Sequence, residues 1–146
     1  MAILDTTLEF STAEELTSTG ATISENIIDL GATGRTVGNI NYTPILFTVN
    51  TTFTSGGAAT LQYELLTSDN ADMSSPTVLH TSGVYALADL AQGKLGTLKF
   101  PDAVYQRYIS LRWTVGTAAF TAGAISAQVA ANAGTFRTFD RGYTVA

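Results

Sequence analysis

The fold is decided by residues 42–66, which read YTPILFTVNTTFTSGGAATLQYELL. Apolar residues alternate with more polar ones on both sides of the glycines: Ile45, Phe47 and Val49 before them, and Leu61, Tyr63 and Leu65 after them. Strict alternation predicts two half-buried strands, because successive side chains of a strand point to opposite faces. Gly56 and Gly57 can adopt the positive φ of a tight reversal, so the two strands are predicted to form a hairpin.

A second stretch, residues 112–130, repeats this pattern as RWTVGTAAFTAGAISAQVA. Residues 47–51 align with 113–117, and residues 53–56 align with 120–123 after one inserted residue. An alternating strand follows the loop in both copies. Two similar hairpins in one small domain predict two halves that face each other, as in a two-sheet sandwich. Ordinary reuse of turn residues in a β protein is the alternative explanation of the repeat.

The remaining elements are also mainly strands. The longest is predicted over residues 105–115, with an inner face of Ile109, Leu111, Trp113 and Val115 and an outer face of Tyr108, Ser110, Arg112 and Thr114. Shorter strands are predicted over residues 4–10, 26–30, 78–80, 84–90 (ending in a helical turn) and 95–100. Residues 12–15 have the spacing of a helix capping box, which predicts a turn or two of helix before a loop over residues 17–25. The chain is therefore expected to be all-β, a two-sheet antiparallel β-sandwich, and Trp113 is expected in its core.

Composition narrows the function classes. The 146 residues carry a net charge of −5, which argues against nucleic-acid binding, and no cysteine, which excludes disulfides. No uninterrupted apolar run of about 18 residues is present, so no membrane partner is expected. Residues 1–93 hold ten acidic residues and one basic residue, whereas residues 94–146 hold six basic and two acidic ones. This asymmetry fits complementary surfaces between subunits, and it also fits charges that cancel within one sandwich.

The end of the chain differs from the rest. We predict a sandwich over residues 1–131 and an extended C-terminal arm over residues 132–146. The arm combines aromatic and arginine side chains, namely Phe136, Arg137, Phe139, Arg141 and Tyr143. This composition is typical of the cores of protein interfaces, so these five residues are the predicted interface. The alternative is that the segment folds back as one more strand of its own sandwich.

Catalytic and metal-binding patterns are not apparent. His80 is the only histidine, and no catalytic partners for it are visible in the sequence. Asp69, Asn70 and Asp72 suggest an oxygen-rich calcium loop, but they match no complete ligand set, and a turn closed by side-chain hydrogen bonds explains them equally well. We therefore expect no catalytic, metal or cofactor-binding residues, no cofactor and no enzymatic activity.

Several short blocks have a characteristic order and spacing along the chain, although each is ordinary strand or turn sequence by itself. They are Ala2-Ile3-Leu4-Asp5, Ile28-Asp29-Leu30-Gly31, FTSGGAATL at residues 53–61, Asp69-Asn70, Ser74-Ser75-Pro76, Gln106-Arg107-Tyr108 and Phe120-Thr121-Ala122-Gly123. In this order the sequence resembles the small jelly-roll cement, or decoration, proteins of tailed-bacteriophage capsids. The likeness extends to about Ala130 and does not cover the arm.

The resemblance implies a jelly roll without catalysis that binds the outside of the phage head and stabilises joints between major capsid subunits. It further implies a location on the outer capsid surface of the virion, after synthesis in the host cytoplasm. Its partners would be the major capsid protein and further copies of itself, as a dimer or a trimer. The alternative is a carbohydrate-binding or fibre-head sandwich, in which exposed aromatic residues such as Tyr42, Tyr85 or Tyr105 stack on a sugar ring.

Overall fold

The computed structural model describes residues 6–31 and 44–130, and this part of the chain is built from β-strands and short 3-10 turns. The elements in chain order are η1 (Thr6–Leu8), β1 (Glu9–Glu15), β2 (Gly20–Ile23), β3 (Ile28–Asp29), β4 (Ile45–Thr54), β5 (Thr60–Ser68), β6 (Thr77–Thr81), β7 (Tyr85–Ala86), η2 (Leu87–Asp89), β8 (Gly93–Leu98), β9 (Tyr108–Gly116) and β10 (Ala122–Val129). The prediction of an all-β protein is confirmed, and so is the helical turn that follows β7.

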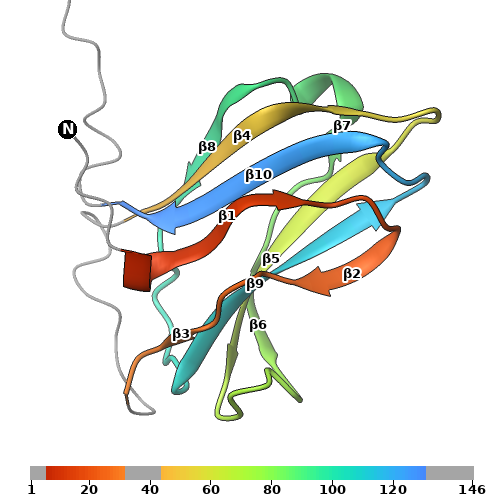
Figure 1. Cartoon of the computed structure of the whole chain (residues 1–146). Helices are drawn as coiled ribbons and strands as arrows, with labels where there is room; N and C mark the ends of the chain where they lie inside the picture. Colours follow the sequence, from red (N-terminus) through yellow and green to blue (C-terminus); the bar gives the residue numbers. More distant parts are fainter. Residues whose placement is uncertain (1–5, 32–43, 131–146) are drawn as a thin grey trace, which may run out of the picture.

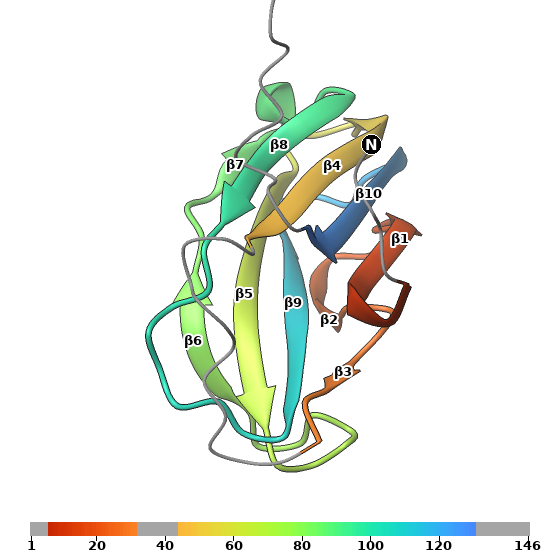
Figure 2. The ribbon, with the colours of Figure 1, turned by 90° about the vertical axis from the view of Figure 1, so that its left-hand side faces the viewer.

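The strands form two antiparallel sheets packed face to face (Figure 1). The first sheet has the order β1-β10-β4-β8, and the second has the order β2-β9-β5-β6, with β3 also paired to β9 and β7 to β5. This is the strand order of a jelly roll, in which two Greek keys wrap into two sheets. Figure 2 shows the same two layers after a quarter turn. The predicted two-sheet jelly-roll sandwich is therefore confirmed.

The two predicted hairpins are wrong. β4 and β5 follow each other in the chain but belong to different sheets, and the same holds for β9 and β10. β4 instead pairs with β10, and β5 pairs with β9. Each presumed hairpin is thus an arch that crosses the end of the core. Alternation determines which face of a strand is buried, but it does not determine which strand becomes its hydrogen-bonding neighbour.

The glycines of the loop after β4 have the conformation of an arch and not that of a hairpin turn. Gly56 and Gly57 do not have the positive φ that a tight hairpin turn requires. At Gly57 the constraint is the other arch, because an added Cβ would lie 3.0 Å from the Cβ of Ala118. The left-handed conformation occurs instead at Gly123, with a φ of +136°, where the pairing of β10 with β4 is irregular.

The sequence repeat has a structural counterpart, because equivalent residues of the two arches contact each other. The ring of Phe47 meets the ring of its equivalent Trp113 edge-on, with centroids 6.1 Å apart. The rings of the equivalent pair Phe53 and Phe120 are 4.6 Å apart. The hydroxyls of Thr54 and its equivalent Thr121 are hydrogen-bonded at 2.9 Å. The two copies therefore face each other, as the repeat predicted.

The core fills the space between the sheets. The predicted inner face of the long strand is buried: Ile109, Leu111, Trp113 and Val115 are 1%, 0%, 0% and 4% exposed. Ser110 alternates with these residues on the predicted outer face, but it is 0% exposed. Ser24, in the connection between β2 and β3, covers it, with the two hydroxyl oxygens 3.0 Å apart.

The beginning of the chain departs most from the prediction. η1 occupies Thr6–Leu8, and β1 starts at Glu9 and continues through residues 12–15, where a helical turn was predicted. The predicted loop over residues 17–25 contains β2. A capping box stabilises a helix only when a helix follows it. Here the side chain of Glu14 contacts the core, as described below.

Candidate interaction surfaces

The predicted interface residues Phe136, Arg137, Phe139, Arg141 and Tyr143 lie outside the described residues, and so does Tyr42. The arm therefore remains a prediction. Within residues 6–31 and 44–130, no helix is long and apolar enough to cross a membrane.

The aromatic platform of the carbohydrate hypothesis is not formed as predicted. Tyr105 is only 2% exposed, and its hydroxyl donates a hydrogen bond of 2.7 Å to the carbonyl of Pro101. Burial raises the pKa of Tyr105 to about 12. Tyr85 is partly exposed, but its ring stacks on Tyr63 with centroids 6.2 Å apart. A buried tyrosine cannot stack on a sugar ring, so Tyr105 cannot serve as a sugar platform in the carbohydrate-binding hypothesis.

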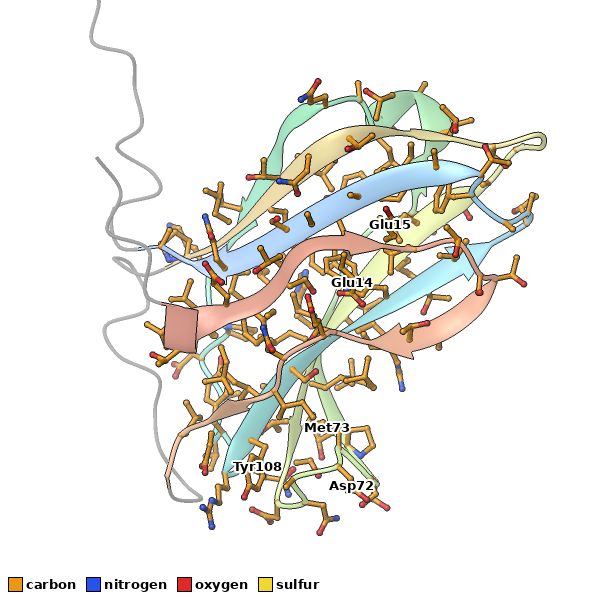
Figure 3. All side chains as sticks on the ribbon, in the orientation of Figure 1. Glu14, Glu15, Asp72, Met73 and Tyr108 are labelled. Atoms are coloured by element: carbon orange, nitrogen blue, oxygen red, sulfur yellow. The ribbon has the colours of Figure 1, made fainter. Side chains whose placement is uncertain are left out.

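The loop containing Asp69, Asn70 and Asp72 is closed by its own hydrogen bonds. The amide of Ser74 donates to Asp72 Oδ1 at 2.9 Å, and the side-chain amide of Asn70 donates to the carbonyl of Ser74 at 3.2 Å. Hydrogen bonds from the hydroxyl and the backbone amide of Ser74 lower the pKa of Asp72. These hydrogen bonds explain the polar residues of the loop as the side chains that close a turn. In Figure 3, Asp72 and Met73 mark this loop at the end of β5 and β6.

His80 lies on β6, with its ring 6.3 Å from the ring of Tyr63. Across the described ranges, no three His, Cys, Asp or Glu side chains are grouped closely enough to hold a metal ion. His80 is thus next to an aromatic core residue rather than in a cluster of acids or bases.

Ion pairs occupy the outer side of the second sheet. On its central strands, Arg112 Nη2 lies 2.5 Å from Glu64 Oε2. At its end, Arg107 binds Asp29 through two hydrogen bonds of 3.0 and 2.9 Å. The hydrogen bond from Arg107 is the largest cause of the lowered pKa of Asp29. The charges of this sheet therefore largely satisfy each other.

The outer side of the first sheet is different, because its central strands β4 and β10 contain no ionisable residue. Their outward side chains are Leu46, Thr48, Asn50, Ser126 and Gln128, which we call the neutral face. The Ser126 hydroxyl donates to Asn50 Oδ1 at 2.7 Å and accepts from the amide of Ala13 at 2.8 Å. An uncharged surface of this kind costs less to desolvate than a charged one, because it buries no charge. It is therefore suited to contact another protein.

Glu14 links the two sheets, a role that the sequence pattern did not reveal. Glu14 is on β1 and lies opposite the buried Ile125 of β10, so its side chain points inward. The adjacent Glu15 points to the other side of the strand (Figure 3). Glu14 Oε2 accepts a hydrogen bond of 3.0 Å from Trp113 Nε1 and another from the hydroxyl of Ser11. The buried indole N–H requires an acceptor, and a lone tryptophan in an alternating strand was the available signal.

Replacement of Glu14 by alanine is expected to lower the free energy of unfolding by about 2 kcal/mol, because it leaves the indole N–H of Trp113 buried without an acceptor. Glu14→Gln keeps an acceptor and should cost less than half as much. Urea unfolding measures both. Equal losses for the two variants would contradict the role of Glu14 as the indole acceptor.

The strand order and the two contrasting outer faces define the protein as a jelly-roll domain with a non-ionic face. The family comparison agrees with this architecture. The chain belongs to the Bbp16 family, whose model matches residues 10–129, from the start of β1 to the end of β10. This family is associated with bacteriophages, so the phage origin implied by the resemblance is supported. No curated protein matches the chain.

Proposed function

We propose that the protein is a non-enzymatic structural protein that binds the outside of a tailed-phage head and stabilises the joints between major capsid subunits. The observation that carries the proposal is the neutral face on a jelly roll of a phage-associated family. Its location is the outer surface of the virion, and the host cytoplasm before assembly. Association into a dimer or trimer, with residues 132–146 as the contacting arm, belongs to the same proposal.

The mechanism is mass action. A protein that binds the assembled shell and not its free subunits stabilises the shell by its binding free energy, which is about 2.7 kcal/mol per site at a free concentration one hundred times Kd. Copies that contact two or more capsid subunits at once add avidity to this effect. The neutral face suits this role, because none of its own side chains is an ion that has to be desolvated when the face is covered.

The test compares heads that carry the protein with heads from a phage in which its gene is deleted. Heads without the protein are expected to release their DNA at a lower temperature, and adding the purified protein should restore the original temperature. Release is followed by the fluorescence of a DNA-binding dye during heating. The same release temperature with and without the protein would remove the proposed role.

A further inference from the structure

A hollow of about 180 Å³ lies beside the neutral face, at the end of the first sheet where the arches cross the core. It is lined by Glu15, Thr17, Thr51, Thr121, Ala122 and Ala124, with the backbone of Gly123. Pockets for drug-sized ligands have volumes of about 300–1,000 Å³. This hollow is smaller and has room for a single side chain of a partner.

The register of the strands explains why the hollow exists. Glu15 on β1 lies opposite Ala124 on β10, and Ala124 lies opposite Thr51 on β4. These three residues therefore form one row across the outer side of the sheet, with a single methyl group in the middle. Gly123, next to that methyl group, contributes no side chain. The row is thus high at Glu15 and Thr51 and low between them.

The polar groups around the hollow are one carboxylate and several hydroxyls. The side chain of Glu15 is exposed and makes no hydrogen bond or ion pair with any residue of the described ranges. The two arginines of those ranges do not reach it, because Arg107 binds Asp29 and Arg112 binds Glu64. An unpaired carboxylate beside hydroxyl acceptors favours a cation with several N–H donors.

The apolar part of the hollow narrows the choice of cation. A lysine side chain has a stem of four methylene groups and a compact ammonium with three donors. Such a stem can lie along the methyl groups of Ala122 and Ala124, with the ammonium at the carboxylate of Glu15. The hollow thus offers an apolar surface and an anionic end in the order that a lysine needs.

We propose that this hollow receives a lysine side chain of the major capsid protein when the protein docks on the head. This assignment rests on the proposed function and adds to it the first specific contact. The net charge of −5 favours a basic partner over a second copy of the same acidic chain. A lysine that enters the hollow also brings the partner against the adjoining neutral face.

The test measures binding of purified protein to heads from the gene-deleted phage by co-sedimentation. Glu15→Gln is expected to weaken binding about fivefold, and Ala124→Leu, which fills the hollow without changing charge, should weaken it at least as much. Glu25→Gln removes the same charge from an exposed position outside the hollow and should bind like the wild type. Trp113 fluorescence verifies that each variant is folded.

The outcomes separate the two claims. Wild-type protein that does not bind the heads overturns the proposed function. Wild-type protein that binds, together with a folded Glu15→Gln variant that binds equally well, overturns the lysine site and leaves the proposed function standing. If Glu15→Gln and Glu25→Gln weaken binding equally, the loss is explained by the change in net charge alone, and this result would also overturn the site.

A second measurement identifies the occupant. Carbodiimide joins a carboxylate to an amine in contact with it, so decorated heads treated with this reagent should yield a cross-link between Glu15 and a lysine of the capsid protein, detected by mass spectrometry. A link from Glu15 to Lys94 or Lys99 of another copy would instead assign the hollow to self-association. Cross-links at other carboxylates with none at Glu15 would contradict any lysine in the hollow.

Discussion

Replacement of Gly123 by alanine is expected to lower the free energy of unfolding by about 3 kcal/mol or more. Two penalties act together at this position. The φ of +136° belongs to a region that residues with a side chain adopt at a cost of about 1–3 kcal/mol. In addition, a Cβ there would lie 2.3 Å from Cδ1 and 2.8 Å from the Cα of Phe53. Rotation of the ring relieves the first contact only, because the second is with backbone.

A matched control for this prediction is Gly56→Ala in the neighbouring arch. A Cβ at Gly56 has no heavy atom within 4 Å, and the φ of Gly56 is not positive. The control should therefore remain within about 0.5 kcal/mol of the wild type. Urea unfolding followed by the fluorescence of Trp113, the only tryptophan, measures both variants. Similar stabilities for the two variants would contradict the close packing of Phe53 on Gly123.

The second large effect is expected from Phe47→Ala, which should cost about 4 kcal/mol, because it opens a cavity between the sheets. Phe47 is 1% exposed, and its ring stacks on Tyr63 with centroids 4.2 Å apart and meets Trp113 edge-on. It is therefore the residue through which β4 of the first sheet contacts both central strands of the second. Its loss removes contacts to two aromatic rings at once.

The control for Phe47→Ala is Thr48→Ala, the next residue of the same strand. Its side chain points outward and is partly exposed, so the expected change is within about 0.5 kcal/mol. Urea titrations should give a lower midpoint for Phe47→Ala with an unchanged slope, if the native and unfolded states keep their compactness. A loss below about 1 kcal/mol for Phe47→Ala would show that β4 does not hold the sheets together through this ring.

The faces of the strands were predictable from the sequence because alternation is a local property. Ile45, Phe47 and Val49 are buried, as are Leu61 and Leu65, and each was assigned to an inner face from its spacing alone. The repeat also predicted correctly that two halves face each other. These features depend on residues two positions apart or on blocks that can be aligned without knowing the fold.

The candidate sites were less predictable, because each one requires residues that are distant in the chain. Glu14 and Glu15 matched a capping pattern, but Trp113 and Ala124, about a hundred positions away, decide what they contact. The alternative carbohydrate-binding hypothesis required an exposed Tyr105, but a hydrogen bond to Pro101 holds its hydroxyl in a buried position. Residue type alone did not distinguish these environments.

The amino-acid sequence by itself determined most strands after residue 26, the side chains that face inward in the long strands, and the duplication of the arch. Only the tertiary structure decided that the arches cross between sheets, that Gly123 rather than Gly56 needs a positive φ, and that Glu15 borders a hollow. The physical reason is that side-chain alternation is set by the geometry of a single strand, whereas pairing, close approach and hollows depend on which strands lie side by side.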